Sequence, residues 1–407
     1  MRDHSNHKSA GRREVIEALL SRIEFARVTE SVPVAQADGR VAAKEYRSRN
    51  VLPNKLTCNM DGIGVYFDDF AHGMPDISDW ERGKQWQFAN TGVAMPADFD
   101  TAIAIERVQV SDDGKLLSVD AVPEERFSCT TPIGANLQEG DLLVEEGELL
   151  NPVLLSVLNM GGYTEVEVYA KPKVAFIPTG NELVAAGGGV PEGKNVDTNA
   201  TMVCAKIAQW GGEPVRFDIV PDDPDQILAA LKKATAECDI IAINAGSSKG
   251  SDDWTCEILE REGEVLFHEA LQAPGKHSSF SILDGKPVIG ISGPPFAAEL
   301  NVDIFLKPFI DVFIGVDTSY APVIMARMLD NCPLEPRRVT LVKRACVRRA
   351  PDGDYVAWQL STDARPKMRA CAQANALLFL DKDGYGYEKG DYFPVELNFP
   401  YSIPPMG

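Results

Sequence analysis

The chain has 407 residues, of which 44% are hydrophobic and 25% are charged, values typical of a soluble globular protein. One hydrophobic core rarely fills a chain of this length, so we expect roughly two to four domains. The formal net charge of −20 argues against a general nucleic-acid-binding protein, because neutralising phosphates requires clustered Lys and Arg. An anionic ligand would need local compensation from backbone N–H groups, a few basic side chains or a divalent cation.

Composition also bears on the cellular setting. No apolar run is long enough to span a bilayer, and the N-terminal residues lack the apolar segment of a secretory signal. The eight cysteines are scattered and include no C-x-x-C pair. We therefore expect a cytoplasmic protein with free, mostly buried thiols, no membrane segment and no cysteine zinc site.

The first predicted element is a helix over residues 12–27. Its apolar side chains recur at helical spacing, with Arg and Glu elsewhere; they are Val15, Ile16, Leu19, Leu20 and Ile23. Residues 46–136 instead show short β-like runs separated by turn residues, which predicts a small β-rich domain. One of these turns is Asp61-Gly62, and an acid before Gly is by itself an ordinary turn residue.

Three short apolar runs between residues 173 and 308 predict the strands of a parallel sheet. Residues 174–177, 239–244 and 287–291 each run directly into a Gly-, Ser- or Pro-rich segment. Helical patterns lie between these runs, and this alternation predicts an α/β domain with helices on both faces of the sheet. In such sheets ligands bind beyond the carboxyl ends of the strands, so we expect the three segments to form a binding edge.

Acidic side chains follow the predicted strands at this edge. Glu182 follows the first run, Asp222 follows a candidate strand over residues 215–220, and Asp253 follows the loop after the second run. Several carboxylates at one edge could hold Mg²⁺, which prefers oxygen ligands and substrate phosphates. Alternatively, Asp222, Asp223 and Asp253 cap the helical patterns that they precede.

Two polar loops at the same edge could bind phosphate. Residues 246–250 form a Gly/Ser loop before a helical pattern, where backbone N–H groups can hold an anion. Their spacing is not that of a P-loop. The turn 274–279 adds the cation of Lys276 and several hydroxyls.

Short strand patterns return in the last part of the chain. Residues 340–347, 355–360, 376–380 and 392–397 are separated by turns that contain Asp-Gly or Gly-Asp. This spacing predicts a last domain that is a small β-barrel or a sandwich.

Short motifs along nearly the whole chain occur in the order and spacing of one known family. The family's S-A-M-D-G-Y-A is similar to residues 58–64, its T-G-A-x-x-P to residues 91–96, its S-T-G-D-E-L to residues 178–183, its D-S-N to residues 197–199, its D-D to Asp222-Asp223, its G-G-V-S-x-G-x-x-D to residues 245–253, its K-P-G-K-P to residues 273–277 and its L-P-G-N-P to residues 291–295. The chain thus resembles a diverged member of the molybdopterin molybdenumtransferases, of the MoeA and gephyrin E-domain type.

The resemblance implies an elongated homodimer whose subunits each have four subdomains. These would be an elongated N-terminal subdomain of residues 1–45 and 137–172, an inserted β-rich domain of residues 46–136, a central three-layer α/β domain with a mostly parallel sheet over residues 173–317, and a C-terminal small β-barrel of residues 318–407. The implied ligand is a pterin nucleotide. A molybdenum enzyme or another cofactor-assembly protein is a further candidate partner, and we expect neither nucleic acid nor a membrane as a partner.

Members of this family use Mg²⁺ to insert molybdate into adenylylated molybdopterin, with release of AMP. By the resemblance, the active-site positions are Asp61, Thr91, Glu182, Asp222 and Asp253, and the last three would hold the metal. A second set is implied in binding the pterin phosphate and the oxyanion: Thr179, Gly180, Gly246, Ser247, Ser248, Lys249, Gly250, Lys276 and Pro295.

Several positions depart from the family pattern, among them the G-G-V-S loop, which reads Ala245-Gly246-Ser247-Ser248. The first Lys of K-P-G-K-P is Ala273, the Pro after its second Lys is His277, and the Asn of L-P-G-N-P is Pro294. The loss of a cation and of a side-chain amide weakens oxyanion binding, and we hypothesise that Lys249 replaces the missing cation. Two alternatives to the enzyme follow: a non-catalytic paralogue that binds molybdopterin or its nucleotide and scaffolds cofactor delivery, and a structural dimer that keeps only the fold.

Overall fold

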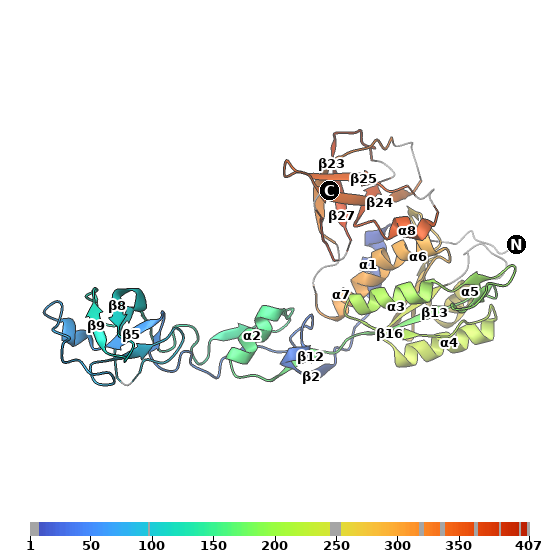
Figure 1. The fold of residues 1–407 in the computed structure, drawn as a ribbon. Coiled ribbons are helices and arrows are strands. Elements are labelled where there is room, and N and C mark those ends of the chain that lie inside the picture. Colours follow the sequence, from blue (N-terminus) through green and yellow to red (C-terminus); the bar gives the residue numbers. More distant parts are fainter. Residues whose placement is uncertain are drawn as a thin grey trace. The chain divides into compact units, whose positions relative to one another are not determined.

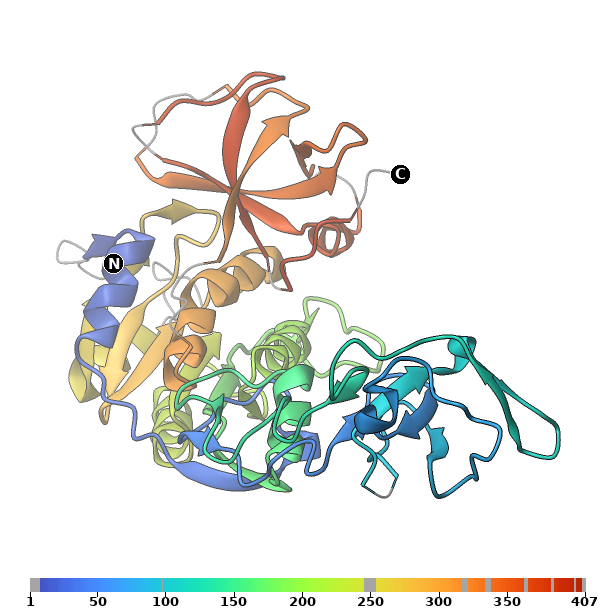
Figure 2. The same cartoon turned by 90° about the vertical axis from the view of Figure 1, so that its left-hand side faces the viewer.

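The computed structural model describes residues 8–96, 98–244, 254–316, 321–333, 338–361, 365–381, 384–398 and 400–404. The chain forms two compact units. The small unit is Thr29–Val168, and the large unit consists of Met1–Val28 and Tyr169–Gly407. Figures 1 and 2 show the chain from two directions.

The large unit is built on a six-stranded sheet. Its strands lie in the order β16 (Glu213–Arg216), β13 (Lys173–Pro178), β17 (Ile240–Asn244), β22 (Lys286–Gly290), β21 (Phe280–Leu283) and β18 (Glu264–Phe267). The first four are parallel, and β21 and β18 continue the sheet in antiparallel fashion. The prediction of a mostly parallel sheet is confirmed, and the three predicted apolar runs correspond to β13, β17 and β22.

Alternation along the strands gives this sheet two buried faces. On β13, Val174 and Phe176 belong to one hydrophobic cluster, whereas Ala175 and Ile177 belong to another. The first face is covered by α1 (Arg12–Leu20), α3 (Asn199–Gln209), α6 (Pro295–Asn301), the π-helical turn η4 (Val302–Leu306) and α7 (Lys307–Phe313). The second face is covered by α4 (Pro224–Glu237) and α5 (Trp254–Glu262). Figure 1 shows α3 and α4 on opposite sides of β13, so the three-layer prediction is confirmed.

Helix α1 is shorter than the predicted helix over residues 12–27. It ends at Leu20, and a non-helical path follows in which Ile23 and Phe25 both contact the first-face cluster. An extended path places every second side chain on one side, which lets both of these residues face the core. The Phe25 ring lies edge-on to Phe313, with 5.1 Å between ring centroids. Helix α1 therefore packs in the large unit, although the resemblance assigned residues 1–45 to the N-terminal subdomain.

The last part of the large unit is a closed five-stranded barrel rather than a sandwich. Its strands follow one another around the barrel as β24 (Thr340–Arg349), β25 (Tyr355–Gln359), β23 (Val323–Met328), β27 (Tyr392–Leu397) and β26 (Ala376–Leu380), and β26 pairs back to β24. Figure 2 shows this barrel in orange to red. Strand β23 has no counterpart among the predicted runs. Short elements complete the unit: β1 (Ser9–Ala10), β19 (Glu269–Ala270), β14 (Leu183–Val184), β15 (Asn195–Val196), β20 (Gln272–Ala273) and α8 (Lys367–Cys371).

Among the described residues, the three hydrophobic clusters of the small unit fall in two regions, with one cluster in the first region and two in the second. The first lies among β2 (Thr29–Pro33), η1 (Val34–Gln36), β3 (Tyr46–Arg47), β11 (Leu142–Val144), α2 (Pro152–Met160) and β12 (Glu165–Tyr169). The second lies in the β-rich part, with β4 (Thr57–Cys58), β5 (Gly62–Val65), η2 (Phe67–Phe70), β6 (Trp86–Ala89), β7 (Thr101–Ala104), η3 (Ile105–Arg107), β8 (Val108–Val110), β9 (Leu116–Val119) and β10 (Thr130–Thr131). Within the described ranges, no helix has the length and apolar composition needed to cross a bilayer.

Candidate functional site

A cleft of about 800 Å³ opens at the carboxyl edge of the parallel strands. It is lined by the segments that follow β13 and β22 and by Asn244, the last residue of β17, in agreement with the predicted edge. Four of the predicted site residues line it: Thr179, Glu182, Lys276 and Pro295. Further lining residues are Leu183, Asn195, Val196, Asp197, Thr198, Asn199, Asn244, Pro274, Gly275, His277, Ser292, Gly293, Pro294, Phe296 and Ala297.

The turn after β13 brings Glu182 to this cleft. Thr179 is buried, and its hydroxyl donates a hydrogen bond of 2.7 Å to the backbone carbonyl of Asn244 at the end of β17. Gly180 then takes a φ of +144°, a conformation that residues with a side chain rarely adopt. A Cβ on Gly180 would lie only 2.6 Å from a carboxylate oxygen of Glu182, so this carboxylate folds back over the glycine.

Asp222 is hydrogen-bonded to this turn at Asn181. Its Oδ2 accepts the backbone N–H of Asn181 at 2.9 Å, and the Oδ1 of Asn181 accepts the backbone N–H of Asp222 at 3.2 Å. Its neighbour Asp223 accepts the backbone N–H of Gln226 at 3.0 Å and begins α4, as the capping alternative predicts. Asp222 therefore positions the turn that carries Glu182.

Part of the predicted anion and metal site lies outside the described residues. This applies to Asp253 and to the loop residues Gly246, Ser247, Ser248, Lys249 and Gly250. Over the ranges that are described, no group of three or more His, Cys, Asp or Glu side chains is arranged to hold a metal ion. The metal set Glu182, Asp222 and Asp253 stays a prediction.

A second turn, residues 274–277, forms the opposite side of the cleft. Gly275 has a φ of +92°, and its carbonyl accepts a hydrogen bond of 3.1 Å from the side-chain amide of Asn301. The oxygen of the same amide accepts the backbone N–H of Ser292 at 3.2 Å. Asn301 is fully buried in α6 and thus ties the turn after β20 to the turn after β22. Our sequence analysis missed it, although an Asn within the apolar stretch 297–306 is a usable signal.

We predict that Asn301→Ala lowers the free energy of unfolding by about 2 kcal/mol, because it leaves the Ser292 N–H without its partner. It also removes one donor to the Gly275 carbonyl, which keeps the Ser278 hydroxyl. Urea denaturation of the purified variant measures this. Asn195→Ala is the matched control, since its exposed side chain lines the same cleft and surface changes cost about 0.5 kcal/mol or less. Equal losses in both variants would contradict this role of Asn301.

The cation of the cleft is partly neutralised. The Nζ of Lys276 lies 3.1 Å from a carboxylate oxygen of Glu269, a buried residue on β19. Close by, Pro294 occupies the position before α6 and offers neither an N–H nor a side-chain amide. Both features reduce the number of groups available to an oxyanion here.

Asp61 and Thr91 lie together in the small unit. One Asp61 oxygen accepts both the backbone N–H of Thr91, at 2.8 Å, and its hydroxyl, at 2.9 Å. These two hydrogen bonds hold the pKa of the Asp61 carboxyl below its usual value. The side chain is exposed and ionised at neutral pH, so it can accept a hydrogen bond or contact a cation.

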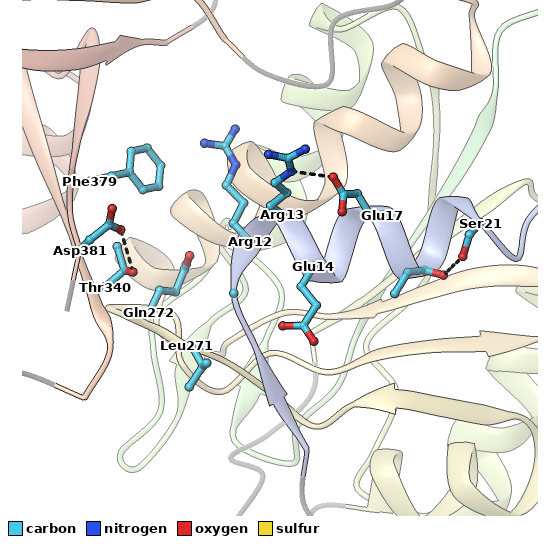
Figure 3. Close-up of a pocket in the computed structure, with 12 residues that line it drawn as sticks. Arg12, Arg13, Glu14, Glu17, Ser21, Leu271, Gln272, Thr340, Phe379 and Asp381 are labelled. Atoms are coloured by element: carbon cyan, nitrogen blue, oxygen red, sulfur yellow. Dashed lines mark hydrogen bonds and ion pairs between the residues drawn. The ribbon is translucent and has the colours of Figure 1, made fainter. Parts of the chain in front are cut away.

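A second pocket of about 870 Å³ lies between the start of α1 and the barrel (Figure 3). Both of its arginines pair with carboxylates. The Arg12 guanidinium bonds both oxygens of Glu396, at 2.9 and 2.7 Å, and lies over the Phe379 ring. Arg13 bonds Glu17, one helical turn further along α1. None of the predicted site residues lines this pocket, and we take the cleft at the strand ends as the candidate site.

Comparison with known families agrees with this choice. Residues 175–312, which supply every residue of the cleft, match the family described as "Probable molybdopterin binding domain". Residues 11–162 match the family described as "MoeA N-terminal region (domain I and II)". The chain belongs to the MoeA family. The resemblance noted in the sequence motifs is thereby confirmed.

Relatives of the MoeA family align with most of the chain. The molybdopterin molybdenumtransferase of Bacillus subtilis is 29% identical over 334 residues, which are 80% of this chain and 76% of the relative. The enzyme of the same name from Haemophilus influenzae is 27% identical over 304 residues, 72% of this chain and 74% of the relative. The crystal structure of the molybdopterin biosynthesis MoeA protein from Pyrococcus horikoshii OT3 has the same fold, with a TM-score of 0.74 at 23% identity over 96% of this chain and 100% of that one.

Proposed function

We propose that this protein acts in molybdenum cofactor biosynthesis, binding adenylylated molybdopterin in the cleft and inserting molybdate with release of AMP. One observation carries the proposal: the predicted residues Thr179, Glu182, Lys276 and Pro295 line one cleft within the segment that matches the molybdopterin-binding family. The names of the curated relatives support the reaction type.

The described donors suit Mg²⁺, the metal of the proposed reaction. In nucleotide-dependent sites Mg²⁺ keeps several waters and needs only one or two carboxylates plus substrate phosphates. Glu182 faces the cleft, and Asp222 uses one of its carboxylate oxygens on the backbone of Asn181. Glu182 would therefore hold the metal, with Asp222 and Asp253 as further candidates. When bound, the metal would offset the negative charge of the two phosphates.

The protein's own groups would orient the substrate. Lys276 is 40% exposed at the cleft and can contact a phosphate or molybdate oxygen while Glu269 stays paired behind it. The carboxylate of Glu182 would draw the metal-bound phosphates toward the turn after β13. The bond that breaks is a P–O bond of the diphosphate between molybdopterin and AMP; an oxygen of water replaces it on phosphorus, so that AMP and the molybdopterin phosphate separate as monophosphates.

We predict that Glu182→Gln lowers the rate of AMP release about 10- to 100-fold, because a neutral amide holds the metal and its phosphates more weakly. The assay combines the protein with adenylylated molybdopterin, Mg²⁺ and molybdate, and measures AMP and incorporated molybdenum. Glu192→Gln is the control, since Glu192 is exposed in the segment between β14 and β15 and does not line the cleft. Equal rates in both variants would remove Glu182 from the reaction.

A second candidate function is binding without turnover. The pairing of Lys276 with Glu269 and the presence of Pro294 at the start of α6 both favour a paralogue that holds molybdopterin, or its nucleotide, and delivers it. Tight binding of adenylylated molybdopterin without AMP release would support this candidate. Light scattering would test the homodimer that the family resemblance implies.

A further inference from the structure

Two asparagines form the floor of the cleft. Asn199 is the first residue of α3, and Asn244 is the last residue of β17. Both line the cleft, yet they are only 4% and 6% exposed. Buried side-chain amides are usually hydrogen-bonded, so each N–H group and each oxygen of these two amides is expected to have a partner.

The hydrogen bonds determine which way each amide points. The Nδ2 of Asn244 donates to the backbone carbonyl of Ile291 at 3.3 Å, which turns its Oδ1 toward Asn199. The Nδ2 of Asn199 donates to that Oδ1 at 2.6 Å and to the carbonyl of Gly293 at 2.9 Å. Both N–H groups of Asn199 are therefore used. Turning this amide over would place its oxygen against two acceptors, so its orientation is fixed.

One strong acceptor is left over. The Oδ1 of Asn199 is buried and has no hydrogen-bond partner among the described residues. A neutral acceptor of this kind is costly to bury unless something donates to it. Because Asn199 lines the cleft, a ligand in the cleft can supply the missing donor.

We propose that the Oδ1 of Asn199 accepts a hydrogen bond from the exocyclic amino group of a heterocyclic ligand bound in the cleft. A neutral amide oxygen at a buried site suits a neutral N–H donor, since such a donor loses less hydration on burial than an ammonium group does. Pro294, Pro295 and Phe296 add apolar surface on which a flat ring can pack. The inference rests on the proposed function, whose substrate carries two such groups, the amino group of its pterin and that of its adenine.

Matched ligand pairs test this directly. AMP is compared with inosine monophosphate, and a soluble pterin with the corresponding lumazine, so that in each pair an amino group is exchanged for a carbonyl. We expect wild-type protein to bind the amino member of one pair about tenfold more tightly, because the carbonyl would face the Asn199 oxygen as a second acceptor. The pair that shows the preference identifies which ring reaches the floor.

The variant Asn199→Ala should reduce this preference to about one. Asn244→Ala is the matched control, because it removes one bond of the same network but leaves Asn199 attached to Gly293. It should keep a clear preference for the amino ligand. Thermal melting checks that both variants fold, and the comparison with Asn244→Ala separates the loss of the Asn199 amide from a general disturbance of the cleft.

The inference would be overturned if wild-type protein binds both members of each pair equally well, or if it binds neither pair. This result is decisive even if Asn199→Ala does not fold. A preference kept in Asn199→Ala would overturn it as well. The inference and the proposed reaction can also be told apart. If the preference is lost only in Asn199→Ala but wild-type protein releases no AMP from adenylylated molybdopterin, the inference is supported and the proposed reaction fails.

Discussion

Replacing Arg344 by Met is expected to lower the free energy of unfolding by about 3 to 5 kcal/mol, the usual cost of removing one partner of a buried ion pair. Arg344 lies on β24 of the barrel and is 4% exposed. Its Nε donates to a carboxylate oxygen of Glu299 on α6 at 2.9 Å, and Glu299 is itself 8% exposed. Without the guanidinium, the cation that remains beside the Glu299 carboxylate among the described residues is the Nζ of Lys206, at 3.6 Å.

The barrel offers a matched control in Arg327→Met. Arg327 pairs with Asp352 and Asp354 at 3.1 and 3.2 Å, but all three side chains are at least 32% exposed. Such surface pairs contribute about 1 kcal/mol or less. Urea denaturation should therefore separate the two variants clearly. If both lose the same small amount, the pair of Arg344 and Glu299 does not hold the barrel to the α/β layers.

This ion pair also bears on the cleft. Helix α6 begins at Pro295, which lines the cleft, and Glu299 follows one helical turn later. A loosened α6 would release both the turn after β22 and the amide of Asn301. We thus expect Arg344→Met to weaken ligand binding in addition to lowering stability.

Between pH 5 and pH 7 the free energy of unfolding is expected to fall by up to about 3 kcal/mol, through Asp303 of η4. Burial raises the pKa of Asp303 from its usual value to about 7, with Glu299 adding to the shift and Lys206 opposing it. The folded protein then keeps a proton that the unfolded chain has already released. The contribution of Asp303 to stability is greatest below this window and is lost as the pH rises through it. The Asp303 side chain is 15% exposed, which makes 3 kcal/mol an upper figure.

The variant Asp303→Asn should reduce this pH dependence, because an amide does not titrate, and the slope that is left would come from carboxyls such as Asp311, whose pKa burial also raises. Asp218→Asn, at an exposed position in the same unit, should leave the slope unchanged. Urea midpoints at pH 5, 6 and 7 measure both. Hydrogen bonds or cations lower the pKa of other carboxyls, such as Asp61 and Asp284. These groups titrate below pH 5 and do not contribute to the slope between pH 5 and pH 7. A slope of the same size in Asp303→Asn would exclude Asp303 as its source.

The cleft's outline was predictable from local patterns. Each apolar run reaches a Gly- or Pro-containing turn, and parallel strands bring such turns to one edge whatever the details of packing. Glu182, Thr179 and Lys276 could be placed there for that reason. The role of Asp222 was harder to foresee, because a metal ligand and a backbone acceptor have the same side chain, and only the position of the Asn181 N–H distinguishes them.

The barrel, too, could be predicted from the sequence only in part. Its strands β24 to β27 were visible as short alternating runs, but neither β23 nor the pairing of β26 with β24 was. Closure of a barrel depends on which strand edges meet, and no single strand carries that information.

By itself, the sequence determined the family, the alternation of strands and helices, and the turn residues that edge the cleft. These follow from spacing, because side-chain periodicity and glycine or proline constraints act within a few residues along the chain. Only the tertiary structure decided that Asn301 joins two turns, that Arg344 meets Glu299, and that Asn199 keeps an unused acceptor at the floor. Such contacts join residues tens of positions apart, and hydrogen bonds depend on distances and angles that no pattern of residue types contains.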